Sequence, residues 1–321
     1  MPEEGAVGGD GTCQPSSTFQ TLGADVSVSS SYSNLPGQKR YAVGRSVAAF
    51  IAGDGVHLID VSSPPEVRLL TDGPVTFSGF QPLFVEVVDD DAVVVGTLQP
   101  EDTLGWFVLR EPVGDVIVPK PLANTSDFLA HLSVGAGCFY LGSSRATYAL
   151  DLEASEEPIL LQGDLSRLAM TPGGRGVATF DLVESLGPSG GCALRNLGSA
   201  VSGDLVASRA DQLWTLRGDR FLQFTAQAQR YEVDLNRTIA DLYPSQRLVV
   251  VGADRDVFVF EDTDPALDPR PLNRLPLLGQ ALAIGPVGGD DDYVAAFVAL
   301  PEFAGPGRVA LEVARLDAGC R

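Results

Sequence analysis

The chain of 321 residues is poor in the side chains that recognise anionic partners. It carries 22 lysines and arginines against 42 aspartates and glutamates, and its formal net charge is −20 at pH 7. Only Lys39 and Lys120 are lysines. Binding to nucleic-acid phosphates needs clustered basic side chains, and no basic stripe is visible in the sequence. We therefore expect no nucleic-acid partner and no attachment to an anionic membrane surface.

Long apolar runs and helical patterns are also missing. No run of about 18 apolar residues occurs, so the sequence predicts no transmembrane segment. No stretch sustains apolar residues three and four positions apart, which excludes long amphipathic helices. The chain does contain 35 glycines, 22 prolines and 45% hydrophobic residues. This composition indicates many turns around an ample apolar core, as in an all-β protein.

Motifs for catalysis or metal binding are scarce. There are two histidines, and no GxSxG motif accompanies them. His57 falls within a strand pattern, so we expect it to be an ordinary strand residue. The segment Asp262–Asp268 begins like a calcium loop but lacks the glycine and the glutamate that an EF-hand needs. The four cysteines form no CxxC pair. We therefore expect no metal and no cofactor.

The segment Val47–Leu70 (VAAFIAGDGVHLIDVSSPPEVRLL) shows how this chain makes strands. A short apolar run ends at a Gly-Asp-Gly turn, where Gly55 can adopt positive φ at no steric cost, so a tight hairpin is favoured. An alternating run follows and ends at Pro64-Pro65, because proline donates no N–H to a sheet ladder. A third short run comes after the break. The segment therefore predicts a small antiparallel meander.

Part of this segment, FIAGDGVHLIDVSSPPEV, resembles the LVIVD repeat of secreted and surface-exposed bacterial β-propellers. The residues that carry the resemblance are Ile51, Ala52, Gly53, Asp54, Gly55, Leu58, Ile59, Asp60, Val61, Ser62 and Pro65. The resemblance implies a β-propeller fold and a location outside the cytoplasm.

Comparable apolar runs recur along the chain at intervals of about 40–45 residues, the period of a four-stranded propeller blade. The runs end at Gly53, Gly96, Gly142, Asp181, Ser208, Gly252 and Ala299. The interval from Asp181 to Ser208 is short, which indicates that blade four or five is reduced. We predict one closed β-propeller over residues 18–321, with about seven four-stranded antiparallel blades and six or eight as alternatives. Residues 1–17 would form a flexible polar tether, and Thr18–Gln38 would supply an edge strand that closes the ring.

The N-terminal residues and the cysteines bear on localisation. Met1–Thr12 contains no apolar segment, so either the protein is cytosolic or a leader has been removed. We expect the second, with the protein secreted, periplasmic or lipid-anchored at the cell surface. Four cysteines allow three pairings. Because a closed ring brings its ends together, we expect Cys13 to pair with Cys320. Cys138 and Cys192 open strands in neighbouring blades and are expected to form the second pair, the alternative being free thiols.

A candidate ligand site follows from the loops after the recurring runs. Three of these loops are long, namely Thr97–Gly105, Leu182–Gly191 and Leu300–Gly307. In equivalent blades they would emerge on one face, and insertions gathered on one face often mark a binding surface. The residues expected on this face are Trp106, Phe303, Glu101, Asp102 and Glu302. Glu86, His131 and Asp241 interrupt the apolar pattern of the innermost strands, so we expect them to face the central channel. The alternatives are neutral lengthening of tolerant loops and a hydrated channel without a ligand.

These features favour a non-catalytic, exported, monomeric propeller that binds a protein, peptide or glycan through one face. The alternative is a propeller hydrolase or lyase that uses acidic residues near the axis. Carboxylates converging on His131 in a deep pocket would favour the enzyme, whereas a shallow face rimmed by aromatic residues would favour binding. The fold alone does not choose between them.

Overall fold

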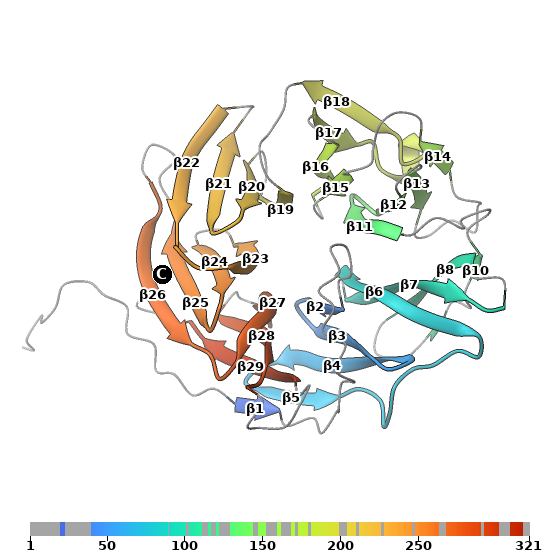
Figure 1. The fold of residues 1–321 in the computed structure, drawn as a ribbon, viewed down its shortest axis with the longest axis horizontal. Helices are drawn as coiled ribbons and strands as arrows, with labels where there is room; N and C mark the ends of the chain where they lie inside the picture. Colours follow the sequence, from blue (N-terminus) through green and yellow to red (C-terminus); the bar gives the residue numbers. More distant parts are fainter. Residues whose placement is uncertain are drawn as a thin grey trace, which may run out of the picture.

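The structure is a computed structural model that describes most of the predicted propeller domain. The described residues are 20–22, 40–88, 90–100, 103–110, 115–116, 120–121, 129–143, 147–151, 159–161, 168–170, 173–178, 181–198, 204–209, 212–225, 228–245, 248–262, 268–289, 292–301 and 309–316. Their strands form seven antiparallel sheets arranged as the blades of a ring (Figure 1). The prediction of an all-β propeller with about seven blades is therefore confirmed.

Each blade is a meander whose first strand lies innermost. Blades 1 to 3 comprise β2 (Tyr41–Val43), β3 (Val47–Ala52), β4 (Gly55–Ser63) and β5 (Glu66–Leu69); β6 (Phe80–Val88), β7 (Asp91–Leu98), β8 (Thr103–Arg110), β9 (Asp115–Val116) and β10 (Lys120–Pro121); and β11 (Leu129–Gly135), β12 (Cys138–Ser143), β13 (Thr147–Asp151) and β14 (Ile159–Leu161). In blade 2 the short strands β9 and β10 both pair with β8.

The remaining blades follow the same order. Blades 4 to 6 comprise β15 (Leu168–Met170), β16 (Arg175–Ala178), β17 (Asp181–Ser185) and β18 (Leu194–Gly198); β19 (Asp204–Arg209), β20 (Gln212–Arg217), β21 (Arg220–Thr225) and β22 (Ala228–Asp234); and β23 (Ile239–Pro244), β24 (Leu248–Ala253), β25 (Asp256–Glu261) and β26 (Arg270–Pro276). Blade 7 contains β27 (Gln280–Val287), β28 (Tyr293–Ala299) and β29 (Val309–Arg315). One short 3₁₀ helix, η1 (Pro188–Gly190), follows β17. Among the described residues no helix is long and apolar enough to cross a membrane.

The ring closes through a strand from the other end of the chain. β1 (Gln20–Leu22) pairs antiparallel with β29, with Thr21 opposite Glu312, and becomes the fourth strand of blade 7 (Figure 1). Consecutive innermost strands contact one another around the ring, and β27 contacts β2. The prediction that Thr18–Gln38 supplies the closing strand is confirmed, whereas the predicted tether 1–17 lies outside the described residues.

The core lies between the blades, because alternate side chains of each central strand point toward the two neighbouring blades. All six residues of β3 are buried, because successive side chains point to opposite faces and both faces are covered. Ala48 and Phe50 pack with Phe297 of blade 7, whereas Ile51 packs with Val94 of blade 2. Fully burying a phenylalanine, isoleucine or valine side chain contributes roughly 1.5–3 kcal/mol. Every central strand therefore stabilises two junctions.

Blades 4 and 5 correct the predicted strand assignment. The run that ends at Ser208 lies in the innermost strand β19, and the second strand of blade 5 is β20. The short interval arose because first and second strands are both apolar, so the two were exchanged in the alignment. Blade 5 has four strands of its own, and neither blade is reduced.

Candidate functional site

The antiparallel order of each blade defines two faces of the ring. One face, called the AB face here, carries the turns between first and second strands and between third and fourth strands. The opposite BC face carries the turns between second and third strands together with the connections between blades. Every loop can therefore be assigned to a face from its place in the strand order.

The predicted long loops do not all lie on one face. Leu182–Gly191 begins within β17 and continues into the turn toward β18, which places that turn on the AB face. This prediction is wrong because the polar strand DLVES resembles a loop in the sequence. Thr97–Gly105 is shorter than predicted, since β7 ends at Leu98 and β8 begins at Thr103. It lies on the BC face together with the connection that follows β28. Glu101, Asp102, Glu302 and Phe303 lie outside the described residues.

Trp106 is not the exposed platform that the sequence indicated. Its side chain is 3% exposed and packs at the junction of blades 2 and 3, with its ring 6.2 Å from that of Phe139. It pairs with Val95 in the centre of the sheet. Strand alternation directs this tryptophan into the junction, so it belongs to the core and not to a ligand surface.

The three polar residues predicted at the axis have different surroundings. The Asp241 carboxylate accepts the backbone N–H of Leu242 at 2.9 Å and that of Ile284 in blade 7 at 3.0 Å. It therefore ties the innermost strands β23 and β27 together. Glu86, half-buried in β6, accepts the N–H of Val87 at 3.3 Å. His131 lies in β11 opposite Gly142, and only its backbone is described.

The other histidine has a structural place. His57 stacks on Phe50 with ring centroids 4.6 Å apart, and burial lowers the pKa of its imidazole. Its partner in β3 is the same phenylalanine. The prediction that His57 is an ordinary strand residue is therefore confirmed.

At the AB end of the axis, an arginine that the sequence did not single out lies between blades. Arg45, in the turn after β2, places its guanidinium 3.5 Å from the carbonyl oxygens of Gly288 and Gly289. It also lies 3.5 Å from the hydroxyl of Tyr243 in blade 6. On the other side of this turn, the N–H of Ser46 donates to the carboxylate of Asp90 at 3.0 Å. Polar groups at this end of the axis connect blades 6, 7, 1 and 2.

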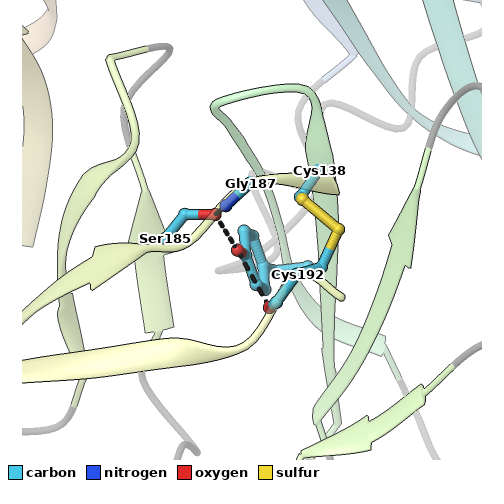
Figure 2. The surroundings of a disulfide bond; sticks show 5 residues. Cys138, Ser185, Gly187 and Cys192 are labelled. Atoms are coloured by element: carbon cyan, nitrogen blue, oxygen red, sulfur yellow. Dashed lines mark hydrogen bonds between the residues drawn. A yellow bond between two sulfur atoms is a disulfide. The ribbon is translucent and has the colours of Figure 1, made fainter. Parts of the chain in front are cut away.

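A disulfide on the AB face joins blades 3 and 4. Cys138 at the start of β12 is bonded to Cys192 in the turn between β17 and β18, and both are buried (Figure 2). The hydroxyl of Tyr140 contacts Ser185 and lies 3.2 Å from the carbonyl oxygen of Cys192. Burial raises the pKa of this tyrosine. The predicted Cys138–Cys192 pair is confirmed, whereas Cys13 and Cys320 lie outside the described residues.

The BC face of blades 5 and 6 carries a charged surface that we call the arginine strip. Its basic members are Arg220, Arg237, Arg255 and Arg274, and its acidic members are Asp219, Glu232, Asp234, Asp254 and Asp256. Hydrogen bonding to Glu232 raises the pKa of Arg220, and hydrogen bonding to Asp256 raises that of Arg274. With four arginines against five carboxylates, the strip is less acidic than the chain as a whole, which has 22 basic and 42 acidic residues. Sequence analysis missed it because its members come from separate turns.

Asp256 anchors one end of the strip. Arg274 binds its carboxylate through two hydrogen bonds of 2.8 Å, and Arg237 lies 3.2 Å from the same group. Both guanidinium groups lie over the ring of Phe258, at 5.8 and 6.0 Å from its centroid. A paired Arg–carboxylate fork and a cation–π contact fix these side chains in one orientation.

An exposed leucine lies at the edge of the strip. Leu278, in the connection from blade 6 to blade 7, is 53% exposed. Arg255 donates to the carbonyl oxygen of Leu278 at 2.8 Å, and the backbone N–H of Leu278 donates to the Glu312 carboxyl group at 3.0 Å. Both backbone groups are held, so the BC face presents this apolar side chain from an ordered segment.

A second set of charged side chains forms a network in the interior of the protein. Asp262 follows β25, and its side chain is fully buried. It accepts a hydrogen bond from Gln223 at 3.1 Å and lies 3.3 Å from Arg230. Arg230 in turn donates to Gln223 at 2.6 Å. This network links blades 5 and 6, and the described residues contain no cluster of three or more potential metal ligands.

Comparisons with known proteins agree on the fold. No protein-family model matches the sequence, and no curated protein is similar to it in sequence. The structure is similar to the RRP9 WD40 repeats, with a TM-score of 0.60 and 11% identity over 94% of this chain and 99% of that chain. It is also similar to U3-55K (TM-score 0.60, 11% identity, 87% and 96% coverage). Hsv2 of Kluyveromyces lactis gives a TM-score of 0.54 at 9% identity, covering 85% of this chain and 96% of that chain. At such identities the likeness establishes the fold alone.

Proposed function

We propose that the protein is an exported, non-catalytic, monomeric β-propeller that binds a protein, peptide or glycan through its BC face. The observation that carries this proposal is the arrangement of that face. The arginine strip of blades 5 and 6, the exposed Leu278 and the longer connections of blades 2 and 7 share it. Ordered polar groups beside an exposed apolar side chain are typical of a recognition surface.

The role of Asp241 favours a scaffold over an enzyme. Both of its carboxylate oxygens accept backbone N–H groups, one of them from the neighbouring blade. Innermost strands have an unpaired edge, and an N–H group left there without an acceptor costs free energy. The residue thus stabilises a blade junction, which supports a structural role for this carboxylate over a role in acid–base catalysis.

The disulfide supports export. Disulfides persist in secreted, periplasmic and surface proteins and are rare in the cytosol. The Cys138–Cys192 bond is buried and joins two blades, which suits a structural and not a transient bond.

The proposal is tested with arrays of peptides and glycans, using the whole chain. The chain offers a matched pair of exposed leucines: Leu278 on the BC face, 53% exposed, and Leu186 on the AB face, 44% exposed. We expect Leu278→Ser to weaken binding to the array hits at least tenfold, and Leu186→Ser to leave it unchanged. Phe303→Ala and Glu302→Gln extend the test to the connection after β28. If Leu186→Ser abolishes binding while Leu278→Ser does not, the partner uses the opposite face and the proposal is wrong.

A further inference from the structure

Blade 7 contains a buried carboxyl group that is half satisfied. Glu312 lies in β29 and is 1% exposed. Its Oε1 atom accepts the backbone N–H of Leu278 at 3.0 Å, whereas its Oε2 atom is buried without a hydrogen-bond partner. A buried polar atom without a partner is costly, and this one lies in a strand whose other inner positions are apolar.

The position of Glu312 connects three parts of the fold. In register it lies between Ala296 of β28 and Thr21 of the closing strand β1. Strand alternation places it on the same face as Ala310 and Ala314, which pack in the apolar junction between blades 6 and 7. Through Leu278 it also holds the connection between those blades. A change in this one carboxyl group therefore affects the junction, the connection and the closure together.

The charged and titratable groups on the neighbouring elements are engaged elsewhere. Arg255 donates to the carbonyl oxygen of Leu278, and Arg315 lies over the ring of Tyr293. In blade 6, Asp256 pairs with Arg274 and Arg237, and Arg270 pairs with Glu261. Asp292 precedes β28. The described residues of β1 carry no titratable side chain. The Leu278 N–H is thus the polar group that meets the carboxyl of Glu312.

Ionisation at this site is unfavourable. Removing a carboxylate from water into an apolar junction penalises the charged form, and one backbone hydrogen bond compensates only part of that penalty. Burial raises the pKa of Glu312 from 4.5 to about 7, and the Leu278 hydrogen bond opposes this rise.

We propose that Glu312 is a proton-operated lock on the closing blade. With the proton on its carboxyl group, the Leu277–Gly279 connection and β29 stay packed. When the proton leaves, the carboxylate draws water, and the junction of blades 6 and 7 opens locally around this connection. The lock is a property of the closed ring and does not depend on the proposed binding function.

The direction of the effect follows from linkage. The closed form binds the proton more tightly than an open form in which Glu312 regains its ordinary pKa of 4.5. The open population therefore rises as the pH rises from 4.5 to about 7, by about tenfold per pH unit, and it levels off above that. From well below pH 4.5 to well above pH 7, the increase approaches about three hundredfold. Acid conditions tighten the junction, and neutral conditions loosen it.

The test is hydrogen exchange of the Leu278 amide between pH 5 and 8.5, corrected for the intrinsic pH dependence of exchange. In the unaltered protein we expect the opening equilibrium to rise about fortyfold from pH 5 to 7 and to level off within another factor of about two by pH 8.5. Glu312→Gln, which mimics the neutral acid, should make the profile flat. Glu66→Gln, at an exposed glutamate of β5, is the matched control and should keep the profile of the unaltered protein.

Each outcome decides the proposal. A profile that rises in the unaltered protein and in Glu66→Gln, but is flat in Glu312→Gln, supports it. A flat profile in the unaltered protein overturns it, and this measurement needs no variant to fold. The same rise in Glu312→Gln as in the unaltered protein assigns the titration to another group and also overturns it. If Glu312→Gln does not fold, Glu312→Met takes its place under the same criteria.

Discussion

Removing the disulfide should cost a large part of the stability of the ring. Cys138 and Cys192 are separated by 54 positions in the sequence. For a closed loop of that size, the lost entropy of the unfolded chain amounts to about 4 kcal/mol at 25 °C. Both side chains are almost fully buried, so alanine is a better replacement than serine, whose hydroxyl would need a partner. We expect Cys138→Ala/Cys192→Ala to lower the free energy of unfolding by about 4 kcal/mol.

The assay is urea denaturation followed by tryptophan fluorescence, because Trp106 lies at the junction of blades 2 and 3 and reports on that side of the ring. Tyr140→Phe is the companion variant, since it removes the hydroxyl contacts to Ser185 and Cys192 and keeps the covalent bond. It should cost only about 1–2 kcal/mol. A double-alanine variant that loses less than about 1 kcal/mol would refute the chain-entropy argument. Such a result would mean that the restriction of the unfolded chain by the disulfide contributes little to stability.

Substitutions at three further positions probe two blade junctions and the strand pairing within blade 2 by the same denaturation assay. Asp262→Ala should destabilise by about 3–5 kcal/mol, since it leaves the guanidinium of Arg230 largely buried without its carboxylate; a loss comparable to that of a surface substitution would contradict this. Asp241→Ala should cost about 1–3 kcal/mol through two backbone N–H groups that lose their acceptor, and Asp241→Asn should recover part of it. Gly96→Ala should cost about 3 kcal/mol or more, because its Cβ would lie 2.0 Å from a carbonyl oxygen of β6, whereas Gly73→Ala, in open space, should be neutral.

The repeat pattern made the fold predictable. Apolar runs bounded by turn residues located an innermost or second strand in every blade, and the period gave the number of blades. The assignment failed where the local pattern was ambiguous: the run at Leu205–Ser208 fits either a first or a second strand, and β17 (Asp181–Ser185) carries too many polar residues to be recognised. Burial in a propeller comes from neighbouring blades, and one segment of sequence does not reveal it.

The site was less predictable, because side-chain orientation depends on register. Trp106 follows a loop and has the character of a binding residue, yet strand alternation turns it into the core. Asp241 was correctly placed in an innermost strand, but its partner Ile284 is more than forty positions away along the chain. The arginine strip is assembled from turns of different strands, so no local motif announces it. The Cys138–Cys192 pair was accessible because few cysteines exist and both open strands in adjacent blades.

The pairing of β1 with β29 determines when the ring can close during synthesis and folding of the chain. β1 precedes blade 1 in the chain and β29 belongs to blade 7, so β1 cannot pair until all seven blades have been synthesised, and blade 7 stays incomplete until then. Before closure, the edge of β29 that pairs with β1 is open, and β2 of blade 1 lacks its contact with β27. Pairing residues so far apart in sequence also slows closure, because the loop must be closed before the contacts reward it. Closure of the ring is therefore a late step of folding, in which two strands from opposite ends of the domain pair.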